Sequence, residues 1–156
     1  MASLLSYALT SLSDVKESLG ITAGDTSKDN LIIRKINQAT LAIENYCGRR
    51  FLATTYTDEE YAATNTNQIV LRQRPVITFT AFGVRNSGLN YDNWEEIDSQ
   101  VYFTDANAGT VDLLFRAVGS WARYRVTYRA GYETIPADLA EACASLAAYY
   151  VNNADG

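Results

Sequence analysis

Residues 122–152 read ARYRVTYRAGYETIPADLAEACASLAAYYVN, and this stretch contains two different periodicities. Up to Tyr128, apolar and polar side chains alternate, which is the pattern of a half-buried β-strand. Beyond Gly131, Pro136 begins a segment in which apolar residues recur every three or four positions, as they do in a helix. The chain therefore changes from strand to helix within this stretch, and we predict a helix over residues 137–152.

The predicted helix 137–152 is apolar on almost every side. Its main stripe consists of Leu139, Cys143, Leu146 and Tyr150, and alanines fill most other positions. Such a helix must be covered on more than one side, and in a small protein another subunit can supply part of that cover. The aromatic end of the helix either anchors a partner or packs on the first long helix. The candidate interface residues here are Leu139, Leu146, Tyr149, Tyr150 and Val151.

Two more helical patterns lie near the N-terminus. The stripe Ile32, Ile36, Ala39, Ile43 and then Tyr46 or Cys47 predicts a long helix that ends at Gly48, with Glu44 among the residues off the stripe. Upstream, Ser13 is a candidate N-cap for a short helix that stops at Gly20.

Residues 51–132, between the helical parts, are rich in β-branched and aromatic residues. The turn-forming residues 105–109 predict a hairpin there. We therefore predict an α+β fold in a single domain, residues 1–156, with helical parts at 13–48 and 137–152. A small antiparallel β-sheet forms its centre, and the C-terminal long helix packs with the first long helix.

The composition excludes several classes of function. The formal net charge of −5 argues against a protein held to nucleic acid by phosphate contacts. With no histidine and only Cys47 and Cys143, one chain cannot build the usual four-ligand zinc site. We expect both thiols to be reduced and buried. No apolar run approaches the ~18 residues of a membrane span, and the first residues lack the basic start of a secretory signal, so no membrane partner is expected.

The common catalytic motifs are absent from the sequence. Without histidine the usual general base and the Ser-His-Asp triad are impossible, and neither a nucleophile elbow nor a phosphate-binding loop occurs. Paired carboxylates can support hydrolysis, but adjacent acids in polar segments are usually solvated loop or edge residues. We predict no enzyme activity, no catalytic, cofactor-binding or metal-binding residues, and no cofactor. The carboxylate candidates are Asp58-Glu59-Glu60, and Glu95-Glu96 with Asp98.

Arg123, Arg125 and Arg129 form the sharpest polar feature, because side chains two apart on a strand project to the same side. Three interpretations are open for these candidate interface residues. They can form a solvated sheet face, pair with the acidic C-terminal segment of a neighbouring subunit, or contact phosphate. The acidic balance of the chain makes phosphate contact the least favoured of the three.

Three segments carry a family resemblance: ALTSLSDVKESLGI at 8–21, AIENYCGR at 42–49, and VTYRAGY at 126–132 leading into IPADL at 135–139. In this order and spacing they resemble the head-tail connector family of long-tailed bacteriophages, the adaptor or head-completion proteins. The resemblance covers about residues 8–51 and 124–150, while the sheet between them is similar only in its general strand pattern.

The resemblance implies a structural virion protein of the neck, assembled in the cytoplasm of the bacterial host. It implies a homo-oligomeric ring, dodecameric in the family, that attaches to the portal protein at the capsid vertex and contacts a downstream neck or tail-completion protein. Genomic DNA would pass through its channel without sequence-specific binding, which suits a wall without net positive charge. The alternatives are a tail-completion or stopper protein of the same neck, and a carboxylate-based hydrolase or carbohydrate-binding sheet.

Overall fold

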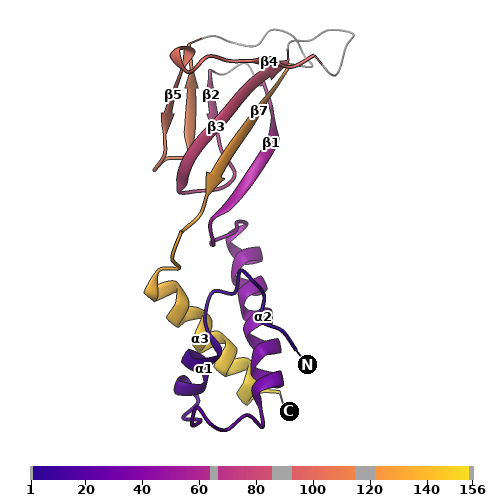
Figure 1. Ribbon diagram of the computed structural model, residues 1–156, viewed down its shortest axis with the longest axis vertical. Helices are drawn as coiled ribbons and strands as arrows, with labels where there is room; N and C mark the ends of the chain where they lie inside the picture. The colour runs from indigo at the N-terminus through magenta and orange to yellow at the C-terminus, as the bar shows by residue number, and fades with distance from the viewer. Residues whose placement is uncertain (1, 64–66, 86–92, 115–121, 155–156) are drawn as a thin grey trace. The chain divides into compact units, whose positions relative to one another are not determined.

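The computed structural model describes residues 2–63, 67–85, 93–114 and 122–154 (Figure 1). The chain divides into two compact units. A helical unit comprises Met1–Leu52 and Tyr132–Gly156, and a β unit comprises Ala53–Gly131. The α+β fold class is confirmed, and the prediction of one domain over residues 1–156 stays a prediction.

In the described residues of the helical unit there are three α-helices: α1 (Leu12–Ser18), α2 (Asp29–Cys47) and α3 (Ala137–Asn152). The N-cap of α1 is Ser11 rather than Ser13, because Ser11 and Asp14 cap each other's backbone N–H groups reciprocally. Gly48 ends α2 at a φ of +64°, a conformation that glycine adopts without strain. Pro136 precedes α3, as the sequence indicates. In the described part of the chain, no helix is long and apolar enough to cross a membrane.

The core of the helical unit lies between α2 and α3, which pack together as predicted (Figure 1). Ile32, Ile36 and Ala39 of the α2 stripe are completely buried, and Cys143 of α3 faces the buried Thr40. The stripe does not continue to the end of α2, because Tyr46 and Cys47 are exposed. Two expectations are therefore wrong: the Cys47 thiol is not buried, and the apolar stripe does not include Tyr46 or Cys47.

Glu44, which lies off the predicted apolar stripe and would there face solvent or a partner, is instead buried within its own chain. Its carboxylate turns back over the end of α2, where it accepts a hydrogen bond from the Phe51 backbone N–H (3.3 Å) and pairs with Arg50 (3.4 Å). The guanidinium of Arg50 in turn lies over the Tyr7 ring, 3.9 Å from its centroid. A buried carboxylate is tolerated here because both of its oxygens have partners.

The N-terminal segment, residues 2–9, runs along α2 and contains a turn at Ser6-Tyr7, where Ala8 N donates to the Leu5 carbonyl (3.0 Å). Three polar side chains of α2 accept hydrogen bonds from its backbone: Asn30 from Ala2 N (2.9 Å), Asn37 from Leu5 N (3.0 Å) and Thr40 from Leu9 N (3.2 Å). The Asn37 amide also donates to the Ser3 carbonyl (2.9 Å). Side-chain hydrogen bonds thus replace a strand partner for this segment, and they lead Leu9 into the helical core.

Among the residues that the structure describes, the β unit contains two antiparallel sheets. The larger has the order β1-β7-β3-β4, formed by Thr54–Ala62, Arg123–Ala130, Val76–Arg85 and Glu95–Glu96. The smaller has the order β2-β6-β5, formed by Gln68–Val70, Thr110–Leu113 and Tyr102–Asp105, with a short 3₁₀ helix (Ser99–Val101) before β5. The antiparallel β region is confirmed, as is the hairpin turn at 105–109, which joins β5 to β6.

The long strand β7 organises the larger sheet. Tyr124, Val126, Tyr128 and Ala130 are buried, and the residues between them are half-buried, so the predicted alternation is confirmed. The buried side of β7 joins one apolar core with residues of β2, β3 and β6. Opposite Thr127, between Tyr56 and Glu59, β1 bulges at Asp58, a non-glycine residue with a φ of +52°. The bulge places the carboxylate of Asp58 on the arginine-bearing side of the sheet, within 3.7 Å of Arg125.

Candidate assembly interface

Helix α3 exposes less apolar surface than its composition indicates. Its buried residues are Cys143, Ala144, Ala147, Ala148 and Val151. Leu139, Leu146 and Tyr150 are partly buried against the same helical core, so α1 and α2 supply much of the cover. Among the five predicted interface residues of this helix, Val151 is buried and Tyr149 is the one that is largely exposed, at 61%.

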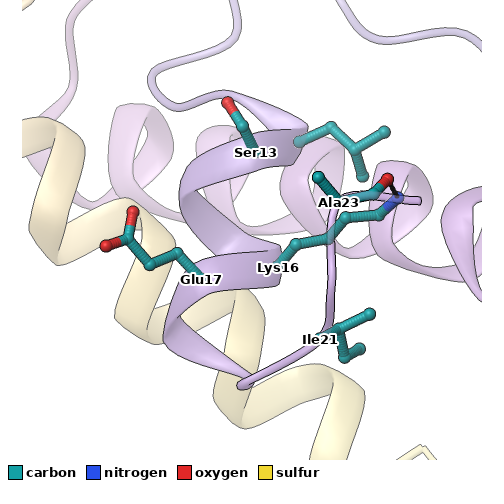
Figure 2. A pocket seen from close by; sticks show the side chains of 6 residues that line it. Ser13, Lys16, Glu17, Ile21 and Ala23 are labelled. Atoms are coloured by element: carbon teal, nitrogen blue, oxygen red, sulfur yellow. Dashed lines mark hydrogen bonds between the residues drawn. The ribbon is translucent and has the colours of Figure 1, made fainter. Parts of the chain in front are cut away.

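An open apolar pocket of about 430 Å³ lies beside α1 (Figure 2). Figure 2 shows the Lys16 side chain directed to the Ala23 carbonyl, to which its Nζ donates at 3.3 Å. The same Nζ lies 2.6 Å from Asp29 Oδ1, so the lysine stem lines the pocket while its charge is neutralised. The lining residues are Leu12, Ser13, Lys16, Glu17, Ile21 and Ala23.

A second depression, of about 300 Å³, adjoins the first and shares Glu17 with it. It lies between α1 and α3 and is lined by Asp14, Glu17, Ser18 and Glu141, without a basic side chain. Hydrogen bonding to Ser11 lowers the pKa of Asp14 below its ordinary value of 3.8, and the carboxylate is ionised at neutral pH. Within the described ranges, no group of three His, Cys, Asp or Glu residues is placed to hold a metal ion.

In the β unit, Arg125 is already paired within its own chain. Its Nη2 donates to Glu96 Oε1 of β4 (2.7 Å), and its Nε lies 3.7 Å from Asp58 Oδ1 of β1. The guanidinium also lies over the Trp94 ring, 5.0 Å from the centroid. This arginine therefore links the central strand to both edge strands of the larger sheet.

Arg123 and Arg129 flank Arg125 on the same side of β7, and all three are half-buried. Arg123 Nη1 donates to the carbonyl oxygen of Ala122 (3.0 Å), and the backbone of Arg129 pairs with Thr55 of β1 and Thr78 of β3. Of the predicted arginine face, the structure thus brings Arg125 together with two of the predicted carboxylate candidates, Asp58 and Glu96.

Glu59 is the exception among the predicted solvated acids, because it points into the β unit. Tyr61 and Tyr128 both donate hydrogen bonds to its Oε2, and Arg72 Nη1 lies 3.0 Å from its Oε1. Arg72 follows β2 of the smaller sheet, whereas Glu59 belongs to β1 of the larger one. The cluster therefore ties the two sheets together, and it stabilises the fold rather than forming an open site.

The electrostatics of this cluster follow from burial and hydrogen bonding. Burial alone would raise the pKa of Glu59, but the hydrogen bonds from Tyr128, Tyr61 and Arg72 outweigh it, and the pKa is lowered. Burial, reinforced by the bond to Glu59, raises the pKa of Tyr61 to about 12 and also raises the pKa of Tyr128. At neutral pH the cluster is thus one carboxylate held by two neutral phenols and a guanidinium.

The remaining carboxylate candidates have ordinary structural positions. Glu60 is exposed on the edge strand β1, and Glu95 is exposed on β4. Asp98 caps the 3₁₀ helix by accepting a hydrogen bond from Gln100 N (2.9 Å). The sequence-predicted acids are therefore distributed over an edge, a cap and a sheet-to-sheet contact.

Comparison with known proteins decides the family. A family model described as head completion protein matches residues 8–154. The chain belongs to the head completion protein family. The resemblance seen in the terminal segments is thereby confirmed, and for this family member it extends through the β unit as well.

Two solved structures share the fold of this head completion family member. One is a chain from the neck of an empty gene transfer agent (GTA) particle computed with C6 symmetry, with a TM-score of 0.61 and 18% identity over 96% of this chain and 81% of that chain. The other is from the virion of a native GTA particle, with a TM-score of 0.59 and 18% identity over 99% of this chain and 84% of that chain. A search of curated proteins gives no match.

The sequence did not reveal the residues that position Arg125. A side-chain Cβ at Gly83 of β3 would lie 2.8 Å from Arg125 Nε, so glycine makes the space through which the arginine reaches Glu96. A glycine inside the apolar run Phe82-Gly83-Val84 is the signal that could have indicated this close approach. The partnership of Glu59 with Arg72 carries no comparable signal, because Glu59 lies on β1 of the larger sheet and Arg72 follows β2 of the smaller one.

Proposed function

We propose that this protein is a structural component of a virion neck, which forms a ring, attaches to the portal protein at the capsid vertex and joins head to tail. The observation that carries the proposal is the match of the head completion family to residues 8–154. The fold shared with a chain from a GTA neck supports the same role. In this role the protein acts by assembly, and no catalytic step is required of it.

The dodecameric copy number is also part of the proposal. A ring of twelve identical subunits contains a six-fold axis, so it is compatible with the C6 symmetry used for the neck of the GTA particle. The ring would continue the DNA channel, and a subunit with a formal charge of −5 would let DNA pass without being held at its phosphates. A downstream neck or tail-completion protein would bind the opposite end of the ring.

The test is assembly on the portal of the same phage. The purified protein is mixed with purified portal, and the products are measured by native mass spectrometry and negative-stain microscopy. We expect a ring of twelve copies at one end of the portal. Binding to an isolated tail-side protein, without binding to portal, would instead identify a stopper or tail-completion protein and contradict the proposal.

A second test addresses the carboxylate-based hydrolase. Glu60→Gln, Glu95→Gln and Glu96→Gln remove the charges of exposed strand acids without touching the Glu59 cluster. We expect phage that carry all three substitutions to remain infectious, and Asp58→Asn to have no larger effect. Loss of infectivity with normal neck assembly would point to chemistry at these carboxylates.

A further inference from the structure

The outer side of α2 is basic and carries an exposed leucine. Counting along the helix, Arg34, Gln38, Leu41 and Asn45 lie opposite the buried stripe of Ile32, Ile36 and Ala39. Leu41 is 41% exposed, and the one acid in this part of the helix, Glu44, is buried. Lys35 is half-buried at the flank of this side, between Ile32 and Gln38, and its Nζ reaches the Gln38 side chain. We call Arg34, Lys35, Gln38 and Leu41 the basic face.

The charges of the basic face have no acidic partner among the described residues. Arg34 Nε donates to the Asn30 carbonyl of its own helix (3.3 Å), and Lys35 Nζ donates to the Gln38 side chain (3.3 Å). These contacts leave both positive charges uncompensated. A face of this kind favours a negatively charged surface on a binding partner.

The α1–α3 side of the helical unit has the complementary character. The depression lined by Asp14, Glu17, Ser18 and Glu141 joins the apolar pocket through Glu17, and together we call them the acidic groove. In the described part of the chain, neither Glu17 nor Glu141 pairs with a base. Three carboxylates that line one depression repel one another, and basic side chains entering it would relieve that repulsion.

The two surfaces lie on different sides of one unit. Helices α1, α2 and α3 each contact the other two, so the outer side of α2 is directed away from the groove between α1 and α3. A closed ring of identical subunits with head-to-tail contacts needs two different surfaces of this kind on every copy. The helical unit presents such a pair.

The basic face and the acidic groove also match in how their charged and apolar parts are placed. On α2 the basic residues Arg34 and Lys35 precede Leu41 by about two turns, or roughly 10 Å. In the groove, the carboxylates of Glu17 and Glu141 stand beside an apolar pocket of a size that accepts a leucine side chain. The basic face therefore has positive charges beside a leucine, and the acidic groove has carboxylates beside an apolar pocket.

We propose that the basic face of one subunit docks into the acidic groove of the next copy of this chain, and that Leu41 enters the pocket beside Leu12 and Ile21. This inference rests on the proposed ring. It adds the identity of the two surfaces that join neighbouring subunits.

Charge reversal on each face tests the pairing. Variant A carries Arg34→Glu and Lys35→Glu, and variant B carries Glu17→Lys and Glu141→Lys. In either variant alone both surfaces have the same sign, so we expect each to lose ring formation on portal and to self-associate at least about tenfold more weakly in sedimentation experiments. Circular dichroism confirms that the variants, which change helix-surface residues, remain folded.

The decisive sample is an equal mixture of the two variants. The acidic α2 of variant A fits the basic groove of variant B, and the unchanged α2 of variant B fits the unchanged groove of variant A. The mixture should therefore restore rings of even copy number in which A and B alternate, as native mass spectrometry can show. Lys28→Glu and Glu95→Lys, which reverse exposed charges outside both surfaces, serve as controls and should assemble as the unaltered protein does.

The outcomes separate this inference from the proposed function. If the unaltered protein forms no ring on portal, the proposed function fails. The self-association of the mixture is then still compared with that of each variant alone by sedimentation, and the pairing is supported only if the mixture associates more strongly. If the unaltered protein and both variants form rings, the proposed function stands and the pairing of the two faces is wrong. Loss of portal binding that the mixture does not restore would make portal the occupant of the groove and would also overturn the inference.

Discussion

Arg125 of β7 reaches across Gly83 of β3 to place its Nη2 2.7 Å from Glu96 Oε1 of β4. The three residues occupy one row of the sheet, because Gly83 is the cross-strand partner of both Arg125 and Glu96. A long side chain can cross a neighbouring strand in this way only where that strand has no side chain of its own. The absence of a Cβ at Gly83 therefore determines the position of the guanidinium.

Gly83→Ala should destabilise the β unit. The new methyl group would lie 2.8 Å from Arg125 Nε and 3.0 Å from its Cγ, so the arginine must move away from Glu96. We expect a loss of ~1–3 kcal/mol in the free energy of unfolding, measured by urea denaturation. The control, Glu96→Gln, removes the exposed ion pair without a clash and should cost less than about 1 kcal/mol. Equal effects of the two substitutions would show that the clash is unimportant.

Glu59→Gln should destabilise the same unit more than a change at the neighbouring exposed acid. The amide cannot accept hydrogen bonds from Tyr61, Tyr128 and Arg72 as the carboxylate does, and the guanidinium loses its counter-charge. We expect a decrease of about 2 kcal/mol in the free energy of unfolding. Glu60→Gln, one residue along β1, should stay within about 0.5 kcal/mol of the unaltered protein.

The Glu59 cluster also predicts a pH dependence. The pKa of Glu59 in the folded state lies below its ordinary value of 4.5, so the unfolded chain binds this proton more readily. The stabilisation is complete above pH 4.5 and is lost as the pH falls through the folded-state pKa. For Tyr61 the sign is opposite, because its raised pKa of about 12 makes the stabilisation decline as the pH rises above 10. Urea denaturation across pH 3–11 should show both slopes, and Glu59→Gln should flatten the acidic one.

Asn37→Ala should release the segment that runs along α2. Asn37 holds this segment on both sides of Leu4, through the Leu5 N–H and the Ser3 carbonyl. We expect amide hydrogen exchange of residues 2–5 to accelerate by about tenfold, while exchange in the core of α2 changes little. Gln38→Ala, at the exposed position next to it, is the matched control. Unchanged exchange in the Asn37 variant would mean that packing, and not the asparagine, holds the segment.

The two cysteines should differ in reactivity. Cys47 is exposed at the end of α2, whereas Cys143 is completely buried and burial raises the pKa of its thiol. A thiol reagent should modify one cysteine in the folded protein and two in denaturant, as mass spectrometry can count. Cys47→Ser should remove the reaction of the folded state, and modification of two thiols without denaturant would contradict the burial of Cys143.

The choice between strand and helix was determined by the sequence itself. The alternation through Arg123–Ala130, the helical spacing after Pro136 and the stripe Ile32, Ile36 and Ala39 each correspond to an element of the structure. These patterns are local, since the period of apolar residues reflects which side of a single element faces a core. The family resemblance was likewise carried by contiguous segments at the two ends, and the match to residues 8–154 confirms it.

Tertiary structure alone decided which polar residues meet. Glu59 and Glu60 are adjacent in the same acidic run, yet one is enclosed by two tyrosines and an arginine and the other is exposed. Likewise, the charged Glu44 is buried and the aromatic Tyr46 is exposed, the reverse of what their residue types indicate. The reason is that α2 ends at Gly48 and the chain turns back over Glu44. Such placements depend on strand pairing, a bulge and a helix end, which bring together residues far apart in the chain and leave no periodic pattern in the sequence.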